Sequence, residues 1–178
     1  MAATPFIGLK RLWYGDVIST AVSKTSFEAW LKTAKEIKNV HEETWKYSQE
    51  DSTEEEYINE LDGEVYYIDE TKKGKKTIEF TIGEWEVDDR VALAGGAKDE
   101  LGWVPPKETQ NINKAFCGMT KNGNFILITK GKVVAKDDTQ KKNIGLGIKV
   151  TALSNGDIPS VRPIDGKNIV VQEQNVAG

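Results

Sequence analysis

The feature that most limits how this chain can fold is an alternation of apolar and polar residues with a period of two. Between residues 77 and 85 the apolar side chains occupy alternate positions, at Ile78, Phe80 and Ile82. Side chains alternate between the two faces of a β-strand, whereas an apolar stripe on a helix needs spacings of three and four. The sequence therefore predicts strands over residues 77–85 and, from the same pattern or from short apolar runs, over 115–120, 124–129, 132–136 and 145–153.

Helical spacing marks two short segments. Residues 26–38 place apolar side chains on one stripe, from Phe27 to Ile37, with Ser26 or Thr25 as the candidate N-cap. Residues 87–94 predict a second short helix, which Gly95-Gly96 ends. With no internal repeat and no long linker, we expect one domain over residues 1–178. Its expected class is mainly β with α+β character: an antiparallel β-barrel or sandwich flanked by one or two short helices.

Charge is distributed unevenly along the chain, although the formal net charge is only −4. Residues 41–70 contain twelve acidic residues and one basic residue, Lys46, whereas residues 114–149 contain eight lysines and two aspartates. We expect a long acidic hairpin over about residues 40–68, with the run 48–56, which has no apolar residue, as its tip. A solvated surface would explain such a block. Attraction between the acidic segment of one copy and a basic segment of another is the alternative.

The sequence contains no recognisable catalytic or metal-binding motif. It has one cysteine, Cys117, and one histidine, His41, which excludes a disulfide framework within the chain and a zinc site of several cysteines. Cys117 is expected to be a buried thiol and His41 a surface residue. The acids at 50–56 lack the spacing and central glycine of an EF-hand loop, and no pair of carboxylates is marked for glycoside hydrolysis. We therefore expect a protein that is not an enzyme and that uses no cofactor and no metal.

Other features bear on location and binding. No apolar run of 18 residues exists, and the first residues do not resemble a signal peptide, so we expect a chain kept in a reducing cytoplasm. An acidic pI near 5.2 argues against a dedicated nucleic-acid binder. The segment 156–178 ends in small and polar residues, and we expect it to be loose. The five tryptophans are spread through the chain and are expected to be core or interface anchors, with an exposed sugar-binding platform as the alternative.

The middle of the chain resembles the major tail proteins of phages, which build the tail tube. The strand Lys76–Trp85 followed by Val87–Gly96 is similar to the strand and short helix at the centre of that family. Residues 40–45 and 57–63 are similar to its long hairpin, and residues 143–153 to its closing strand. The resemblance covers about residues 37–155.

The resemblance implies a structural virion protein of a phage or prophage, assembled in the bacterial host cytoplasm. Members of the family form rings, usually of six subunits, that stack into a tube around a lumen for DNA. The same fold serves in contractile injection systems and type VI secretion tubes. The implied partners are further copies of the chain and other tail proteins such as tape measure, sheath or baseplate components. DNA would pass without specific binding, and no membrane would be involved.

Two function classes are therefore expected: a self-assembling tube subunit and, as the alternative, a small carbohydrate- or protein-binding β-domain that uses exposed aromatic residues. For the first, an acidic lumen would repel phosphates, and acidic residues could instead contact lysines of a neighbouring ring. The candidate lumen and assembly residues are Glu50, Asp51, Glu54, Glu55, Glu56, Lys72, Lys73, Lys75, Lys76, Glu79, Lys141 and Lys142.

Overall fold

The computed structural model describes residues 5–171, and the fold is mainly β with antiparallel pairing throughout its sheets. An eight-stranded sheet forms the body, in the order β2 (Lys35–Ile37), β1 (Arg11–Gly15), β9 (Ile112–Met119), β10 (Phe125–Gln140), β11 (Asn143–Ala152), β6 (Lys76–Ile82) and β3 (Lys46–Gln49), with β12 (Val161–Ile164) also beside β10. Two separate hairpins are β4 (Thr53–Ile58) with β5 (Val65–Lys72), and β7 (Ala97–Asp99) with β8 (Gly102–Val104). The helices are α1 (Lys24–Thr33), α2 (Val87–Ala94) and a 3₁₀ turn, Gly166–Asn168.

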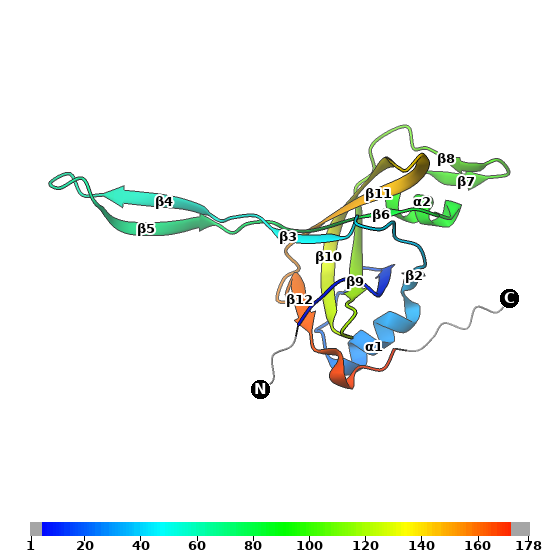
Figure 1. Cartoon of the computed structure of the whole chain (residues 1–178), viewed down its shortest axis with the longest axis horizontal. Coiled ribbons are helices and arrows are strands. Elements are labelled where there is room, and N and C mark those ends of the chain that lie inside the picture. The colour runs from blue at the N-terminus through cyan, green and yellow to red at the C-terminus, as the bar shows by residue number, and fades with distance from the viewer. Residues whose placement is uncertain (1–4, 172–178) are drawn as a thin grey trace.

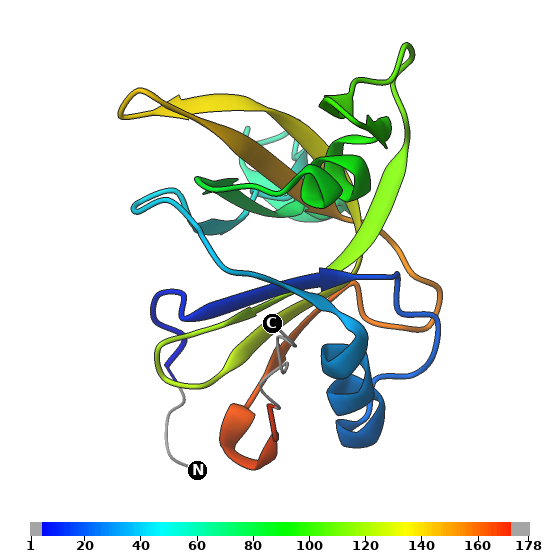
Figure 2. The same cartoon turned by 90° about the vertical axis from the view of Figure 1, so that its right-hand side faces the viewer.

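The long strand β10 joins the two layers that Figure 2 shows above and below one another. Its first part pairs with β12 and its second part with β11, on the same edge, and the register with β9 shifts between Ile128 and Gly131. Such an irregularity bends a strand and increases its local twist. The sheet therefore folds over on itself and encloses apolar side chains from both layers.

The predicted β-rich antiparallel class is confirmed, but no closed barrel forms within residues 5–171. The end strands β2 and β3 do not pair with each other. Side chains fill part of the opening instead. The indole of Trp45 lies against Gly118 of β9, so closely that a β-carbon added to Gly118 would be only 2.9 Å from it. Closure into a barrel needs a continuous ladder of hydrogen bonds, which short end strands cannot supply here.

Two apolar cores lie on opposite faces of β1, β9 and the first part of β10. The inner core joins the two layers and includes Phe80, Phe116 and Ile148. The outer core packs α1 against the sheet through Phe27 and Leu31. A sheet covered on both faces in this way must carry apolar side chains on both faces. Through the inner core it also supports the layer that contains β6 and β11.

The first helix is shifted from its predicted position. It spans Lys24–Thr33 rather than residues 26–38, because Ser23 forms a capping box with Ser26 and Ala34 adopts an extended conformation. Ile37, which was expected on the helical stripe, lies in β2 and contributes to the inner core. The second helix spans Val87–Ala94, as predicted, and ends at Gly95, whose φ is 83°.

Part of the segment expected as a loose tail is structured. Residues 161–164 form β12, which pairs with β10, and Val161 is buried in the inner core. A free edge of β10 would expose unpaired backbone groups, and β12 covers that edge. Residues 172–178 of the predicted tail lie outside the described residues.

A partly buried ion pair joins β1 to β2. The guanidinium of Arg11 donates two hydrogen bonds of 2.8 Å to the carboxylate of Glu36, whose side chain is 8% exposed. These bonds hold the pKa of Glu36 below its ordinary value of 4.5, with a smaller contribution from Lys38. A carboxyl group with a lowered folded-state pKa stabilises the fold above its ordinary pKa and loses that contribution as the pH falls through the folded-state value.

We expect Glu36→Gln to lower the free energy of unfolding at neutral pH by about 1.5–3 kcal/mol, the usual worth of hydrogen bonds to charged groups. The difference from the wild type should shrink as the pH is lowered below 4.5, because Glu36 of the unfolded chain then binds a proton that the folded protein takes up only at a lower pH. Urea titrations at a series of pH values measure it. A difference that does not change with pH would contradict the assignment.

Candidate assembly surfaces

The hairpin β4–β5 forms an arm that extends away from the body (Figure 1). It continues the paired strands β3 and β6, and the chain reverses over residues 59–64. The amide of Leu61 donates to the side chain of Asn59, the amide of Glu64 donates to Asp62, and Gly63 has a φ of 74°. These contacts are typical of a tight turn, since Asn and Asp side chains hydrogen-bond the backbone two residues on.

The long hairpin is therefore present, but the prediction of its tip is wrong. The acids Glu54, Glu55 and Glu56 lie in β4 and not in a tip loop, while Asp62-Gly63 lies in the reversing turn. The reversing turn contains a residue with positive φ. Glycine adopts this conformation readily and the acids at 54–56 do not, so the reversal forms at Gly63. The arm accordingly spans residues 53–72.

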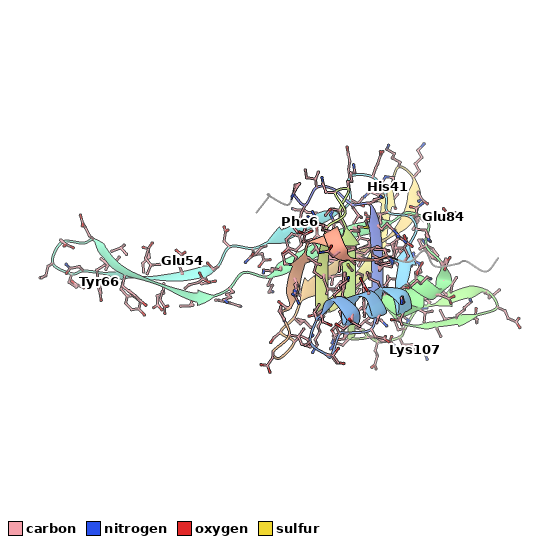
Figure 3. The ribbon with its side chains drawn as sticks, turned by 90° about the horizontal axis from the view of Figure 1, so that it is seen from below. Phe6, His41, Glu54, Tyr66, Glu84 and Lys107 are labelled. Carbon is pink, nitrogen blue, oxygen red and sulfur yellow. The ribbon has the colours of Figure 1, made fainter. Side chains whose placement is uncertain are left out.

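The two faces of the arm carry different side chains. Tyr57 lies opposite Tyr67, with ring centroids 5.6 Å apart, and Glu55 lies opposite Asp69 on the same face. We call these four residues the tyrosine face. The other face carries two cross-strand pairs: Glu54 with Glu70, and Glu56 with Ile68. Figure 3 shows Glu54 and Tyr66 on the arm, far from the body.

The arm is poorly stabilised by its own contacts. All its strand residues are exposed except Asp69, which is partly buried. Two like-charged pairs face each other directly, Glu55 with Asp69 and Glu54 with Glu70, and such pairs destabilise a β-ladder. A two-stranded hairpin in water is marginal even without this repulsion. The arm has the properties of a segment that is stabilised by contact with something else.

The two backbone segments that lead into the arm lie very close together where the arm joins the body. A β-carbon on Gly74 would lie 1.6 Å from the carbonyl oxygen of Glu50, and the amide of Glu50 donates to the carbonyl of Lys75 at 2.9 Å. A groove at this junction brings together the predicted residues Glu50, Asp51, Lys72, Lys73, Lys75 and Lys76, with Glu70. Six of the twelve predicted lumen and assembly residues are thus neighbours within one chain.

We expect Gly74→Val to disrupt the junction, because backbone atoms cannot move aside as a flexible side chain can. The thermal transition of the body should shift little, since the arm packs chiefly against itself. Limited proteolysis should cut the variant within residues 50–75 faster than the wild type. Gly63→Asn, at a position with positive φ and nothing near its β-carbon, is the control expected to retain wild-type resistance.

A second surface lies on the outer side of the β10–β11–β6–β3 layer. Directly paired residues form a row across it: Val134, Lys149, Glu79 and Lys46. Lys132 and Lys136 lie on the same face of β10, on either side of Val134, which is 52% exposed. We call the surface formed by Lys46, Lys132, Val134, Lys136 and Lys149 the lysine face. It borders a groove of about 750 Å³ that is lined by Thr81 and Gly147 among other residues.

The remaining predicted residues lie at or near this groove. Glu79 is not an isolated acid: its carboxylate is 3.9 Å from the ammonium of Lys149. Lys141 and Lys142 form the turn between β10 and β11, both with positive φ. The ammonium of Lys141 donates to Glu42 at 2.7 Å, which raises the pKa of Lys141 and lowers that of Glu42. Neither Lys141 nor Glu79 is therefore an unpaired charge.

Sequence reasoning did not select the lysine face. Its members come from three strands, and only the tertiary fold places them together. A local signal was present in the spacing Lys132-x-Val134-x-Lys136, which puts all three side chains on one face of a strand. The tyrosines of the arm were not among the contact residues predicted from the sequence either.

Cys117 and His41, which were considered for catalysis or metal binding, both lie at least partly buried in the fold. Cys117 is fully buried in the outer core, and burial raises the pKa of its thiol. His41 is partly buried at the groove, where its amide donates to Thr81. No cluster of three or more His, Cys, Asp or Glu side chains suited to a metal ion occurs in residues 5–171.

The tryptophans are also packed into the fold rather than fully exposed. Trp13 is buried and the other four are partly buried, and the indoles of Trp30, Trp85 and Trp103 donate to backbone carbonyls. The guanidinium of Arg90 lies 3.9 Å from the ring of Trp85 and 4.9 Å from that of Trp103. The exposed aromatic residues of the described chain are Phe6, Tyr47, Tyr57, Tyr66 and Tyr67.

Among residues 5–171, no helix has the length and apolar character needed to cross a membrane. When the sequence is compared with models of protein families and with curated proteins, neither comparison finds a match.

Proposed function

We propose that this protein is a structural subunit that assembles with copies of itself, and specifically that it builds a tail tube of a phage, prophage or related injection system. The single observation that carries the assembly proposal is the arm. Its strands are almost wholly exposed, it carries repelling acid pairs, and it presents tyrosines to solvent. Aromatic side chains of this kind are enriched in protein interfaces.

The tube itself is proposed from the resemblance of residues 37–155 to phage major tail proteins. The β-rich body with a projecting hairpin is compatible with that architecture. The free edges of β2 and β3 offer unpaired backbone groups to a neighbouring copy, which would extend the sheet from subunit to subunit. Glu79 lies between lysines, so an acidic lumen would have to depend on other residues.

Electron microscopy of the concentrated, purified chain tests the proposal. We expect rings or stacked tubes, and sedimentation velocity should show species larger than the 19.8 kDa monomer. A uniform monomer at all concentrations would overturn self-assembly and favour a small binding domain. Closed dimers alone would retain self-association but reject the tube.

A further inference from the structure

We propose that the tyrosine face of the arm docks on the lysine face of a second copy of this chain. The inference rests on the proposed self-assembly and names the surface that receives the arm. The arm carries eight acidic residues between positions 53 and 70 and no basic residue in that interval. The occupant of the lysine face is therefore argued from charge complementarity between two surfaces of one sequence.

The chemistry of the two faces matches in its arrangement as well as in its sign. On the arm, the apolar pair Tyr57–Tyr67 adjoins the acidic pair Glu55–Asp69. On the body, exposed Val134 adjoins Lys132, Lys136 and Lys149. Docking would place the tyrosine rings over Val134 and the carboxylates among the ammonium groups. The repulsion between Glu55 and Asp69 would then be relieved by lysines of the partner copy.

Of the other lysines predicted to meet acids of a neighbouring copy, all except Lys142 are less available than Lys132 and Lys136. Lys141 is paired with Glu42, and Lys72 to Lys76 lie at the junction of the arm beside Glu50, Asp51 and Glu70. By contrast, within residues 5–171 neither Lys132 nor Lys136 forms an ion pair, and both are exposed.

Acids also border the groove, and three of them are already engaged. Glu79 faces Lys149, Glu42 binds Lys141, and Asp138 accepts hydrogen bonds from Thr81 at 2.6 Å and Gln140 at 2.9 Å. These contacts hold the pKa of Asp138 below its ordinary value, with the bond from Thr81 as the largest cause. The charges left to meet an arm are mainly those of lysines.

The two surfaces also limit the kinds of assembly that the contact can form. The arm and the lysine face are different surfaces, and the arm points away from its own body (Figures 1 and 3). A contact between different surfaces is heterologous, so each copy can receive one arm and offer another. Such a contact can generate rings or open chains of subunits, or it can close as a twofold dimer in which two copies exchange arms.

Charge reversal tests the proposal in the full chain. We expect the arm variant Glu55→Lys with Asp69→Lys, and the face variant Lys132→Glu with Lys136→Glu, each to weaken self-association by about tenfold or more. Because the contact is heterologous, an equimolar mixture of the two variants should associate again: the reversed arm meets the reversed face, and the native arm meets the native face. Sedimentation velocity of each variant and of the mixture measures this.

Matched controls separate docking from general effects of charge. Lys107→Glu changes an exposed lysine that lies on the other side of the body from His41 at the groove (Figure 3), and it should leave association at the wild-type level. Thermal unfolding of each variant reports folding. Failure of the mixture to associate, or normal association of the face variant, would overturn the docking site. If the wild type itself stays monomeric, the proposed function fails, and the docking site falls with it.

Engineered disulfides give a second, geometric test. The native Cys117 is fully buried, so introduced cysteines will dominate the reaction with an oxidant. Tyr57→Cys with Val134→Cys should form covalent multimers on oxidation, whereas Ile68→Cys with Val134→Cys, which uses the opposite face of the arm, should form far fewer. Equal yields from both pairs would contradict docking through the tyrosine face.

Discussion

Removal of the arm is expected to abolish assembly and leave the body folded. The structure suggests a clean design: the sequence Asn-Gly replaces residues 51–74 and closes a two-residue hairpin between Glu50 and Lys75, whose backbones already share a hydrogen bond of 2.9 Å. The arm strands pair chiefly with each other, so their loss removes little packing from the body. The shorter connection also lowers the entropy cost of closing the loop.

The expected result is a monomer whose unfolding free energy is within about 1 kcal/mol of the wild-type value measured under dissociating conditions. Sedimentation velocity and electron microscopy should show neither rings nor tubes. Shortening only the tip, with Asn-Gly in place of residues 59–64, retains the tyrosine face and is the matched control for assembly. Assembly of the armless variant would show that the arm is not the principal contact, and its unfolding would show that the arm belongs to the body.

The second large effect is expected at Phe116, which connects the two layers of the body. Its side chain is fully buried, and its ring centroid lies 6.1 Å from that of Tyr14 and 6.1 Å from that of Phe80. Phe116→Ala removes apolar contacts on both sides and leaves a cavity that the surrounding strands cannot fill. The expected loss of unfolding free energy is about 3–5 kcal/mol.

Urea denaturation followed by tryptophan fluorescence measures the loss. Phe116→Leu, which retains most of the volume, should lose markedly less. Phe6→Ala, at a side chain that is 40% exposed, should change stability by less than about 0.5 kcal/mol. Equal losses for Phe116→Ala and Phe6→Ala would contradict the assignment of Phe116 to the central core.

Elements with one buried face could be predicted from the sequence. Ile78, Phe80 and Ile82 alternate in β6 because one face of that strand packs on the inner core. The helix α2 has its predicted bounds, and the hairpin of β9 and β10 turns at Asn122-Gly123, where Gly123 has a φ of 84°. In each case a local pattern encodes the structure, since the period or the turn chemistry is independent of distant residues.

The strand β1 shows why other elements could not be predicted. Its residues Leu12, Trp13 and Tyr14 are all buried, because Leu12 and Tyr14 face the inner core and Trp13 faces the outer core. A strand covered on both faces has no alternation of apolar and polar residues. Likewise β12 is too short to show a period, and it is a strand because β10 has an edge to cover.

The sequence by itself determined the β-rich class, the existence of an acidic hairpin and the separation of acidic from basic segments. These properties depend on residue type and on neighbours a few positions away. Only the tertiary structure decided that Glu54 to Glu56 lie along an exposed strand, and that lysines from β3, β10 and β11 share one face. The physical reason is register: hydrogen bonds between strands far apart in the chain determine which side chains become neighbours, and no local pattern contains that information.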